Sequence, residues 1–173
     1  IVSFVGLNQT LGDRMSLMSS EISSWMSGDS KPTSVGLRLN MYEKAIKNIE
    51  NVPFFGYGLR TSNISLFKDD KSEMGKKSSR YNHLHNAYLT NYYNGGIPLL
   101  GALLLLLFVP IRLFLKANSQ NHHDPVFISG ILLILGYSSF GLVNILLGDT
   151  YMNGFYTFFL AIFMVLNNKS IQV

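Results

Sequence analysis

The sequence predicts an all-α, polytopic membrane protein in which three transmembrane helices follow a large, partly helical outer loop. Two observations carry this prediction. Three apolar segments follow one another in the second half of the chain and are joined by short polar loops, a succession that buried helices of a soluble protein do not explain. Charged side chains are concentrated in the first half, and residues 97–173 contain only Arg112, Lys116, Asp124, Asp149 and Lys169.

The three apolar segments are predicted to be spans. The first, 97–116, has no charge before Arg112, and Pro98 lies where the start of a helix tolerates proline. The second, 125–147, has no charged side chain. The third, 151–166, is short against the roughly 20 residues that a span needs, so it has to tilt little or thin the bilayer.

The short loops predict the orientation. The loop 117–124 with its flanks and the tail 167–173 contain the basic residues of this half, Arg112, Lys116 and Lys169. The hairpin 148–150 contains none. Because basic residues in short loops favour the cytoplasm, we expect the loop and the tail on the cytoplasmic side and the hairpin on the outer side.

The long polar segment 8–96 is then expected on the outer side, because long loops cross the membrane largely regardless of their charge. Residues 1–7 are apolar and lack the basic lead and cleavage site of a signal peptide. We interpret them as the end of a preceding membrane helix, which predicts that the chain is the C-terminal part of a longer protein.

A helix is predicted at the start of the polar segment. Ser34 is its expected N-cap, and Pro53 is expected to end it around Glu50. The apolar residues that recur at helical spacing are Tyr42, Ala45, Ile46 and Ile49.

Arg38 is predicted to lie on that apolar stripe, four residues before Tyr42. Its neighbours at helical spacing include no carboxylate, and it sits in the first turn, where the helix dipole disfavours a cation. A phosphate group bound by Arg38 and by the N–H groups of the helix start would explain this position. The alternative is that Arg38 reaches water or a distant carboxylate.

A second candidate site lies in the segment 82–92, which is stopped by glycines before the first span. If it is helical, His85 shares a face with Tyr88, Leu89 and Tyr92, whereas His83 points elsewhere. An imidazole with a pKa of about 6.5 can accept a proton there at neutral pH. His-x-His also occurs in metal sites, but no third ligand is evident and the chain has no Cys. A histidine that only caps or packs is the third alternative.

Two further stretches carry weaker signals. The glycines of the turn Pro53–Gly58 indicate flexibility or a close backbone approach, and no phosphate-binding glycine loop is present in the sequence. The run Lys68–Arg80 is rich in charge and is interpreted as a mobile, solvated loop.

The order of these elements resembles a known family. Ser34-x-Gly36-x-Arg38-x-x-x-Tyr42 is followed by Pro53-Phe54-Phe55-Gly56-Tyr57-Gly58, by His83-x-His85-Asn86-x-x-Leu89, and by a glycine and a span. This order is similar to the bacterial O-antigen ligase and polymerase family, and His-x-His-Asn and Arg-x-x-x-Tyr look closest to the lipopolysaccharide O-antigen ligase branch. The resemblance covers about residues 32–166.

The resemblance implies a membrane glycosyltransferase in the bacterial inner membrane, with its large loop facing the periplasm. Such an enzyme moves a glycan from undecaprenyl diphosphate to a hydroxyl of the lipid A core. The expected partners are therefore this lipid-linked donor, the lipid A core acceptor and membrane lipid, with no nucleic acid, no cofactor and no metal. A polymerase that uses the same donor, a pilin-directed oligosaccharide transferase, and a non-catalytic membrane subunit or glycan transporter remain as alternatives.

By the same resemblance, His85 would activate or orient the acceptor hydroxyl, and Arg38 would hold the diphosphate, with His83 as a secondary catalytic candidate. Arg38, Asn86, Tyr42 and Arg80 are the expected substrate-binding residues. Members of the family have about a dozen spans and a further basic site residue in an earlier half. We therefore expect these 173 residues alone to lack a complete active site.

Overall fold

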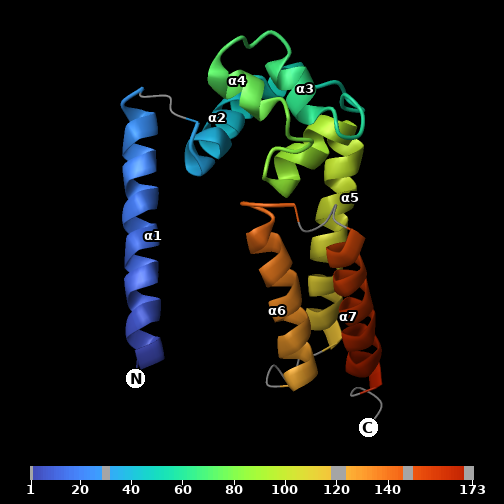
Figure 1. Ribbon diagram of the computed structural model, residues 1–173. Coiled ribbons are helices and arrows are strands. Elements are labelled where there is room, and N and C mark those ends of the chain that lie inside the picture. Colours follow the sequence, from blue (N-terminus) through green and yellow to red (C-terminus); the bar gives the residue numbers. More distant parts are fainter. Residues whose placement is uncertain (1, 29–31, 118–123, 146–149, 170–173) are drawn as a thin grey trace. The chain divides into compact units, whose positions relative to one another are not determined.

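The computed structural model describes residues 2–28, 32–117, 124–145 and 150–169, which are helices joined by turns, with no strand in these ranges (Figure 1). The chain divides into two units. Unit 1 consists of residues 1–50 and 63–82, and unit 2 of residues 51–62 and 83–173. The helices are α1 (Val2–Met26), α2 (Ser34–Lys47), a 3₁₀ turn (Ile49–Asn51), α3 (Ser62–Phe67), α4 (Glu73–Ser78), α5 (Ala87–Ala117), α6 (Pro125–Phe140) and α7 (Thr150–Lys169).

Unit 1 is built around α2. Leu37, Met41 and Ala45 form its buried stripe, at the i, i+4, i+8 spacing of one helix face. The predicted stripe was therefore wrong in part, because Ile46 and Ile49 are exposed and only Ala45 is shared. Both sets have helical spacing, so the periodicity alone could not choose between the two faces.

The segment 63–82 is fastened to α2 by polar side chains. Lys44 Nζ lies 2.6 Å from Asp70 Oδ2 and 4.5 Å from the centre of the Phe67 ring. The amide of Asn63 is fully buried and donates to the Met41 sulfur of α2 at 3.7 Å, and it also ties the segment to itself by donating to the Ser78 carbonyl at 3.0 Å. The interpretation of Lys68–Arg80 as a solvated loop was wrong, since it contains α4 with a buried Met74.

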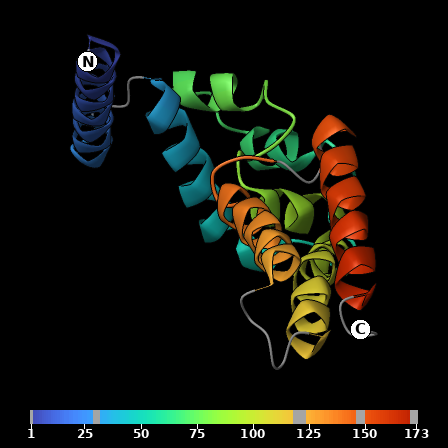
Figure 2. The same cartoon turned by 90° about the horizontal axis from the view of Figure 1, so that it is seen from below.

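Unit 2 contains a three-helix bundle. Figures 1 and 2 show α5, α6 and α7 side by side, and each helix contacts the other two. The bundle core consists of Leu103, Leu107 and Phe114 from α5, Phe127, Ile134 and Tyr137 from α6, and Tyr156 and Leu160 from α7.

Three tyrosine hydroxyls connect the helix pairs of the bundle. Tyr88 of α5 donates to the Ser138 carbonyl of α6 at 2.9 Å, and Tyr137 of α6 donates to the Met152 carbonyl of α7 at 2.8 Å. Tyr156 of α7 completes the cycle by donating to the Leu106 carbonyl of α5 at 3.0 Å.

The last of these bonds has a specific cause. The Leu106 carbonyl would normally accept from the N–H four residues later, but that residue is Pro110, which has none. The Tyr156 hydroxyl replaces the missing donor. A carbonyl freed by proline inside an apolar bundle requires such a partner, because leaving it unpaired costs free energy.

Helix α5 bends at Gly96, where φ is 62° and ψ is −153°. The turn Pro53–Gly58 binds the backbone groups that this bend releases. Tyr57 and Gly58 donate their N–H groups to the carbonyls of Tyr93 (2.8 Å) and Asn94 (3.0 Å). In return, the Ile97 N–H donates to the Phe54 carbonyl at 3.1 Å.

This junction is a close backbone approach. The Asn94 carbonyl faces Pro98, which has no N–H to offer, so Gly58 supplies the donor. A Cβ on Gly56 would lie 2.6 Å from backbone atoms of residues 94–96. The sequence left two interpretations of the glycines in this turn, flexibility and close backbone approach. The close backbone approach is confirmed.

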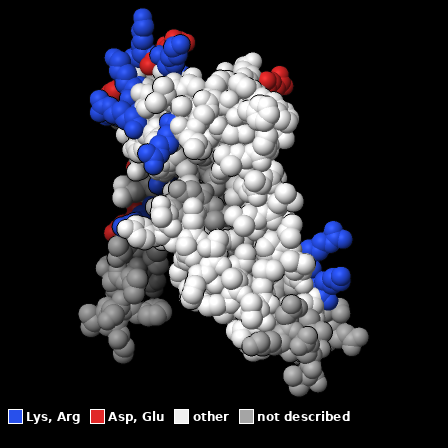
Figure 3. All heavy atoms as spheres, turned by 90° about the vertical axis from the view of Figure 1, so that its right-hand side faces the viewer, with Lys and Arg blue, Asp and Glu red and all other residues white. Residues whose placement is uncertain are grey.

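Within the described residues, two helices are long and apolar enough to cross a membrane, α5 and residues 150–167 of α7. The first and third predicted spans, 97–116 and 151–166, fall within them. The second, 125–147, contains α6, which ends at Phe140 and is followed by a turn; residues 146–147 lie outside the described residues, and this span stays a prediction. Figure 3 shows an uncharged surface over the bundle, with basic side chains near one end. The exposed Arg112 and Lys116 lie near the end of α5.

Candidate functional site

The segment His83–Asn86 is a tight turn that precedes α5, so the helical conformation considered for residues 82–92 holds only from Ala87 onward. His85 has φ of 52°, in the left-handed region that costs a non-glycine residue about 1 kcal/mol or more. Leu84 is fully buried, and its N–H donates to the Thr90 hydroxyl at 3.0 Å. The buried Leu84 and this bond hold the strained backbone in place.

Asn86 fixes the other end of the turn. Its Oδ1 accepts from the Leu89 N–H at 2.9 Å, which makes Asn86 the N-cap of α5. Its Nδ2 donates to the Leu142 carbonyl at 3.0 Å, and the neighbouring Ala87 N–H donates to the Gly141 carbonyl at 2.7 Å. The structure therefore gives Asn86 a positioning role, and its predicted contact with substrate stays a prediction.

The two histidine rings lie together. Their centres are 4.4 Å apart in an edge-to-face arrangement, so the expectation that His83 points away from His85 was wrong. Burial lowers the pKa of His83 below its usual value, because the charged imidazolium is poorly solvated there. His83 is therefore neutral at neutral pH. Nδ1 of His85 is shielded from solvent.

Arg38 lies on α2 and is exposed, next to the buried Leu37 rather than on the buried stripe. The expectation that it lies on the apolar face was therefore wrong. No carboxylate lies within ion-pair distance of its guanidinium in the part of the chain that the structure describes. Tyr42, one turn later, is half-buried, and burial raises the pKa of its hydroxyl although Arg38 lowers it. Arg38 is thus open to an anion, beside a neutral phenol.

The start of α2 does not offer its amides to that anion. The Val35 N–H donates to the Glu21 carboxylate of α1 at 3.2 Å, and the Gly36 N–H donates to the side chain of the N-cap, Thr33, at 3.1 Å. Ser34 is the first helical residue, so its prediction as the N-cap was wrong by one position. The Val35 and Gly36 N–H groups are thus occupied within the protein, and the phosphate site predicted at the helix start stays a prediction.

The predicted site residues divide between the units. His83, His85 and Asn86 belong to unit 2 and form one compact turn. Arg38, Tyr42 and Arg80 belong to unit 1, where Arg80 is exposed just after α4. The convergence of Arg38 with His85 stays a prediction.

Sequence reasoning missed the partners that hold the histidines. Thr90 lies four residues after Asn86 and is buried, and Gly141 and Leu142 come from the end of α6, more than 50 residues away. Thr90 could have been suspected, because a Thr one turn into a helix can reach back to the chain before the cap. The α6 contact depends on tertiary packing and has no local sequence signal.

The model of the O-antigen ligase family matches residues 1–106, well over half of the chain and a range that contains all six predicted site residues. The chain belongs to the O-antigen ligase family. An uncharacterized protein of Haemophilus influenzae is 32% identical over 127 residues, which are 72% of this chain and 32% of that relative.

The chain therefore spans about a third of the length of this curated relative. No solved structure matches the chain. Members of the O-antigen ligase family are membrane-associated ligases or polymerases of glycans, which agrees with the two helices that are long and apolar enough to span a membrane.

Proposed function

We propose that the protein is an O-antigen ligase of the bacterial inner membrane, which moves a glycan from undecaprenyl diphosphate to a hydroxyl of the lipid A core on the periplasmic side. The observation that carries the proposal is the histidine turn of a family member, placed immediately before a helix able to span the membrane. At that position His85 can meet a substrate whose lipid part lies in the bilayer.

The reaction forms one bond and breaks one. The acceptor oxygen attacks the anomeric carbon of the donor sugar, and the bond from that carbon to the diphosphate oxygen breaks. The imidazole of His85 accepts the proton of the acceptor hydroxyl or holds that hydroxyl in line. His83, neutral because it is half-buried, packs against the His85 ring and adds no second positive charge.

Arg38 has the complementary role. Undecaprenyl diphosphate leaves with increased negative charge, and a guanidinium stabilises that charge when it is fixed beside the leaving group. The exposed position of Arg38 and the absence of a nearby carboxylate among the described residues support this assignment. Tyr42 and Arg80, on the same unit, are the further substrate contacts that we propose.

The test is complementation of a strain that lacks its own ligase with the full-length protein. We expect His85→Asn to abolish O-antigen on the lipid A core at normal protein abundance, because asparagine tolerates the left-handed backbone but lacks the imidazole. Arg38→Ala should have the same effect without changing abundance, because Arg38 is exposed.

Lipopolysaccharide gels read the outcome, with Tyr81→Ala, an exposed residue of unit 1, as control. Normal O-antigen in His85→Asn would refute the proposed role. Single repeat units on the core, rather than none, would assign the protein to the polymerase branch. Loss of protein in both variants would instead indicate a structural role and a non-catalytic subunit.

A further inference from the structure

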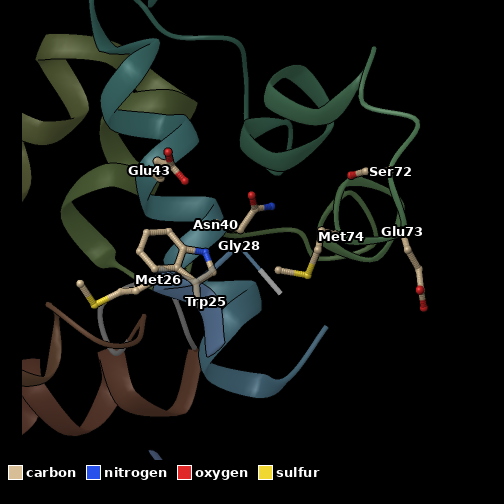
Figure 4. Close-up of a pocket in the computed structure, with 8 residues that line it drawn as sticks. All are labelled: Trp25, Met26, Gly28, Asn40, Glu43, Ser72, Glu73 and Met74. Carbon is tan, nitrogen blue, oxygen red and sulfur yellow. The ribbon is translucent and has the colours of Figure 1, made fainter. Parts of the chain in front are cut away.

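Unit 1 contains a cavity of about 670 Å³, bounded by the end of α1, by α2 and by the start of α4. None of the predicted site residues lines it. Figure 4 shows the residues that do: Trp25, Met26, Gly28, Asn40, Glu43, Ser72, Glu73 and Met74. The cavity lies within one unit, and its volume is in the range of small-molecule sites.

The wall of the cavity combines one large aromatic ring with a few polar groups. Trp25 is partly exposed, and in Figure 4 its indole, the Asn40 amide and the Met74 side chain face the centre, whereas the Glu73 carboxylate points away. Ser72 shapes the rim, since its hydroxyl donates to Asp70 at 2.6 Å and accepts from the Gly75 N–H at 2.9 Å.

Asn40 is the lining residue whose hydrogen-bonding capacity is not fully used within the described structure. Its Nδ2 is shielded from solvent and finds no hydrogen-bond acceptor within the part of the chain that the structure describes. An unmade bond of this kind costs about 1–3 kcal/mol. A half-turn of the amide exchanges Nδ2 and Oδ1, so the side chain can present a donor to the cavity when an acceptor arrives there.

The charges of the cavity exclude the diphosphate as its occupant. None of its lining residues in the described structure is basic, and Glu43, whose carboxylate pairs with Lys47 on its own helix, is one of its acidic lining residues. A carboxylate repels a phosphate but accepts hydrogen bonds from hydroxyl groups. The aromatic face, the amide and the carboxylate together suit a ligand with an apolar face and a rim of hydroxyls.

We propose that this cavity binds an uncharged sugar residue of a glycan. The apolar C–H face of the sugar packs on the Trp25 indole, while Glu43 accepts from one hydroxyl and Asn40 donates to another. That this glycan is the one carried by the lipid-linked donor rests on the proposed function. The binding chemistry does not, because none of the residues assigned to the transfer step lines the cavity.

The experiment uses full-length protein in lipid nanodiscs and the glycan released by mild acid from the lipid-linked donor of the source organism. Saturation-transfer NMR should show contact of the sugar C–H protons with the protein. We expect Trp25→Ala and Asn40→Ala each to weaken this binding about tenfold. Trp25→Phe, which keeps an aromatic face, should retain most of it.

Ile46→Ala, an exposed residue of α2 outside the cavity, is the matched control and should bind normally. His85→Asn should also bind the glycan normally. Loss of transfer in that variant would then be distinguished from loss of glycan binding at this cavity. Unchanged binding in both Trp25→Ala and Asn40→Ala, or displacement of the glycan by inorganic pyrophosphate, would overturn the proposal. If Trp25→Ala does not fold, Asn40→Ala decides alone.

Discussion

The two units hold their irregular segments in different ways. In unit 2, the turn Pro53–Gly58 is fixed to α5 by backbone hydrogen bonds, two of them to carbonyls beside the Gly96 bend. In unit 1, the segment 63–82 is fixed to α2 by side chains, chiefly the Lys44–Asp70 ion pair and the contact of the buried Asn63 amide with the Met41 sulfur. Backbone bonds of the first kind do not titrate, whereas an ion pair responds to pH and salt.

The difference follows from the surroundings of each segment. Pro110 frees the Leu106 carbonyl within the apolar bundle, where water cannot serve as the partner, so Tyr156 supplies the donor. At the bend, Gly58 donates to the Asn94 carbonyl that Pro98 leaves without a helical partner. Lys44 and Asp70 are partly exposed, and an ion pair tolerates that position. Unit 2 should therefore be sensitive to steric change at the junction, and unit 1 to the charge of single groups.

The largest effect is expected from Gly96→Ala. A Cβ there would lie 1.8 Å from the Phe54 carbonyl oxygen, and the backbone angles of Gly96 belong to a region that only glycine populates. The turn and the helix would have to separate, at a cost of about 3 kcal/mol or more. Protein abundance and thermal unfolding in detergent measure the loss.

Gly101→Ala is the control for that variant. It lies in the same helix, and an added Cβ meets no atom within 4 Å. We expect it to be neutral or slightly stabilising, because alanine is the better helix former. Equal behaviour of the two variants would show that the junction between the turn and α5 does not contribute to stability.

A smaller effect is expected from Asn86→Ala, which removes the α5 cap and the bond to the Leu142 carbonyl. The loss of stability should be about 1–2 kcal/mol. Transfer should fall through kcat, because His85 loses its position. Asn86→Asp restores the acceptor of the cap and should recover part of both.

Asn91→Ala is the matched control, since its amide bonds only within its own helix, to the Ala87 carbonyl at 2.7 Å. Initial rates and hydrogen exchange of the Leu84 and Leu89 amides distinguish the two roles of Asn86. If KM for the donor rose while both amides kept their protection, Asn86 would be a substrate ligand and its positioning role would be secondary.

The sequence predicted the apolar helices well, because hydropathy reports burial in lipid or core directly. Sequence reasoning failed where two different structures fit the same hydrophobic pattern. Residues 141–147 are as apolar as α6, so hydropathy could not show that the helix ends at Phe140. On α2, both Ile46 and Leu37 extend a stripe through Ala45, and only the packed unit shows that Leu37 is buried.

The residues of the candidate site stay predictions, and the local geometry of its histidines was not predicted. The motif around His83 and His85 was found from spacing, yet its left-handed turn was not, because histidine carries no signal for that backbone. The polar run that contains α4 was interpreted as a loop, although Ser72 is the N-cap of a helix there. The run has many charged residues and a short helix buries few side chains, so the hydrophobic pattern of α4 is weak. Both failures concern structure that tertiary contacts impose.

The smallest effect concerns the ion pair of unit 1. Hydrogen bonds from Lys44 and Ser72 lower the pKa of Asp70 to about 2. Because the unfolded chain takes up this proton near pH 4, the pair stabilises the segment 63–82 above that pH, and the contribution is lost as pH falls toward 2. After solvent screening it is worth about 1 kcal/mol.

Hydrogen exchange of peptides from the segment 63–82, corrected for the intrinsic pH dependence, measures this contribution between pH 5 and pH 3. We expect protection to fall with pH in the native protein, and to be lower and nearly independent of pH in Asp70→Asn. Asp69→Asn, which alters the exposed neighbouring carboxylate, should behave as the native protein does. If Asp70→Asn kept full protection at pH 5, buried contacts such as that of Asn63 would fasten the segment, and the two units would not differ in the way described.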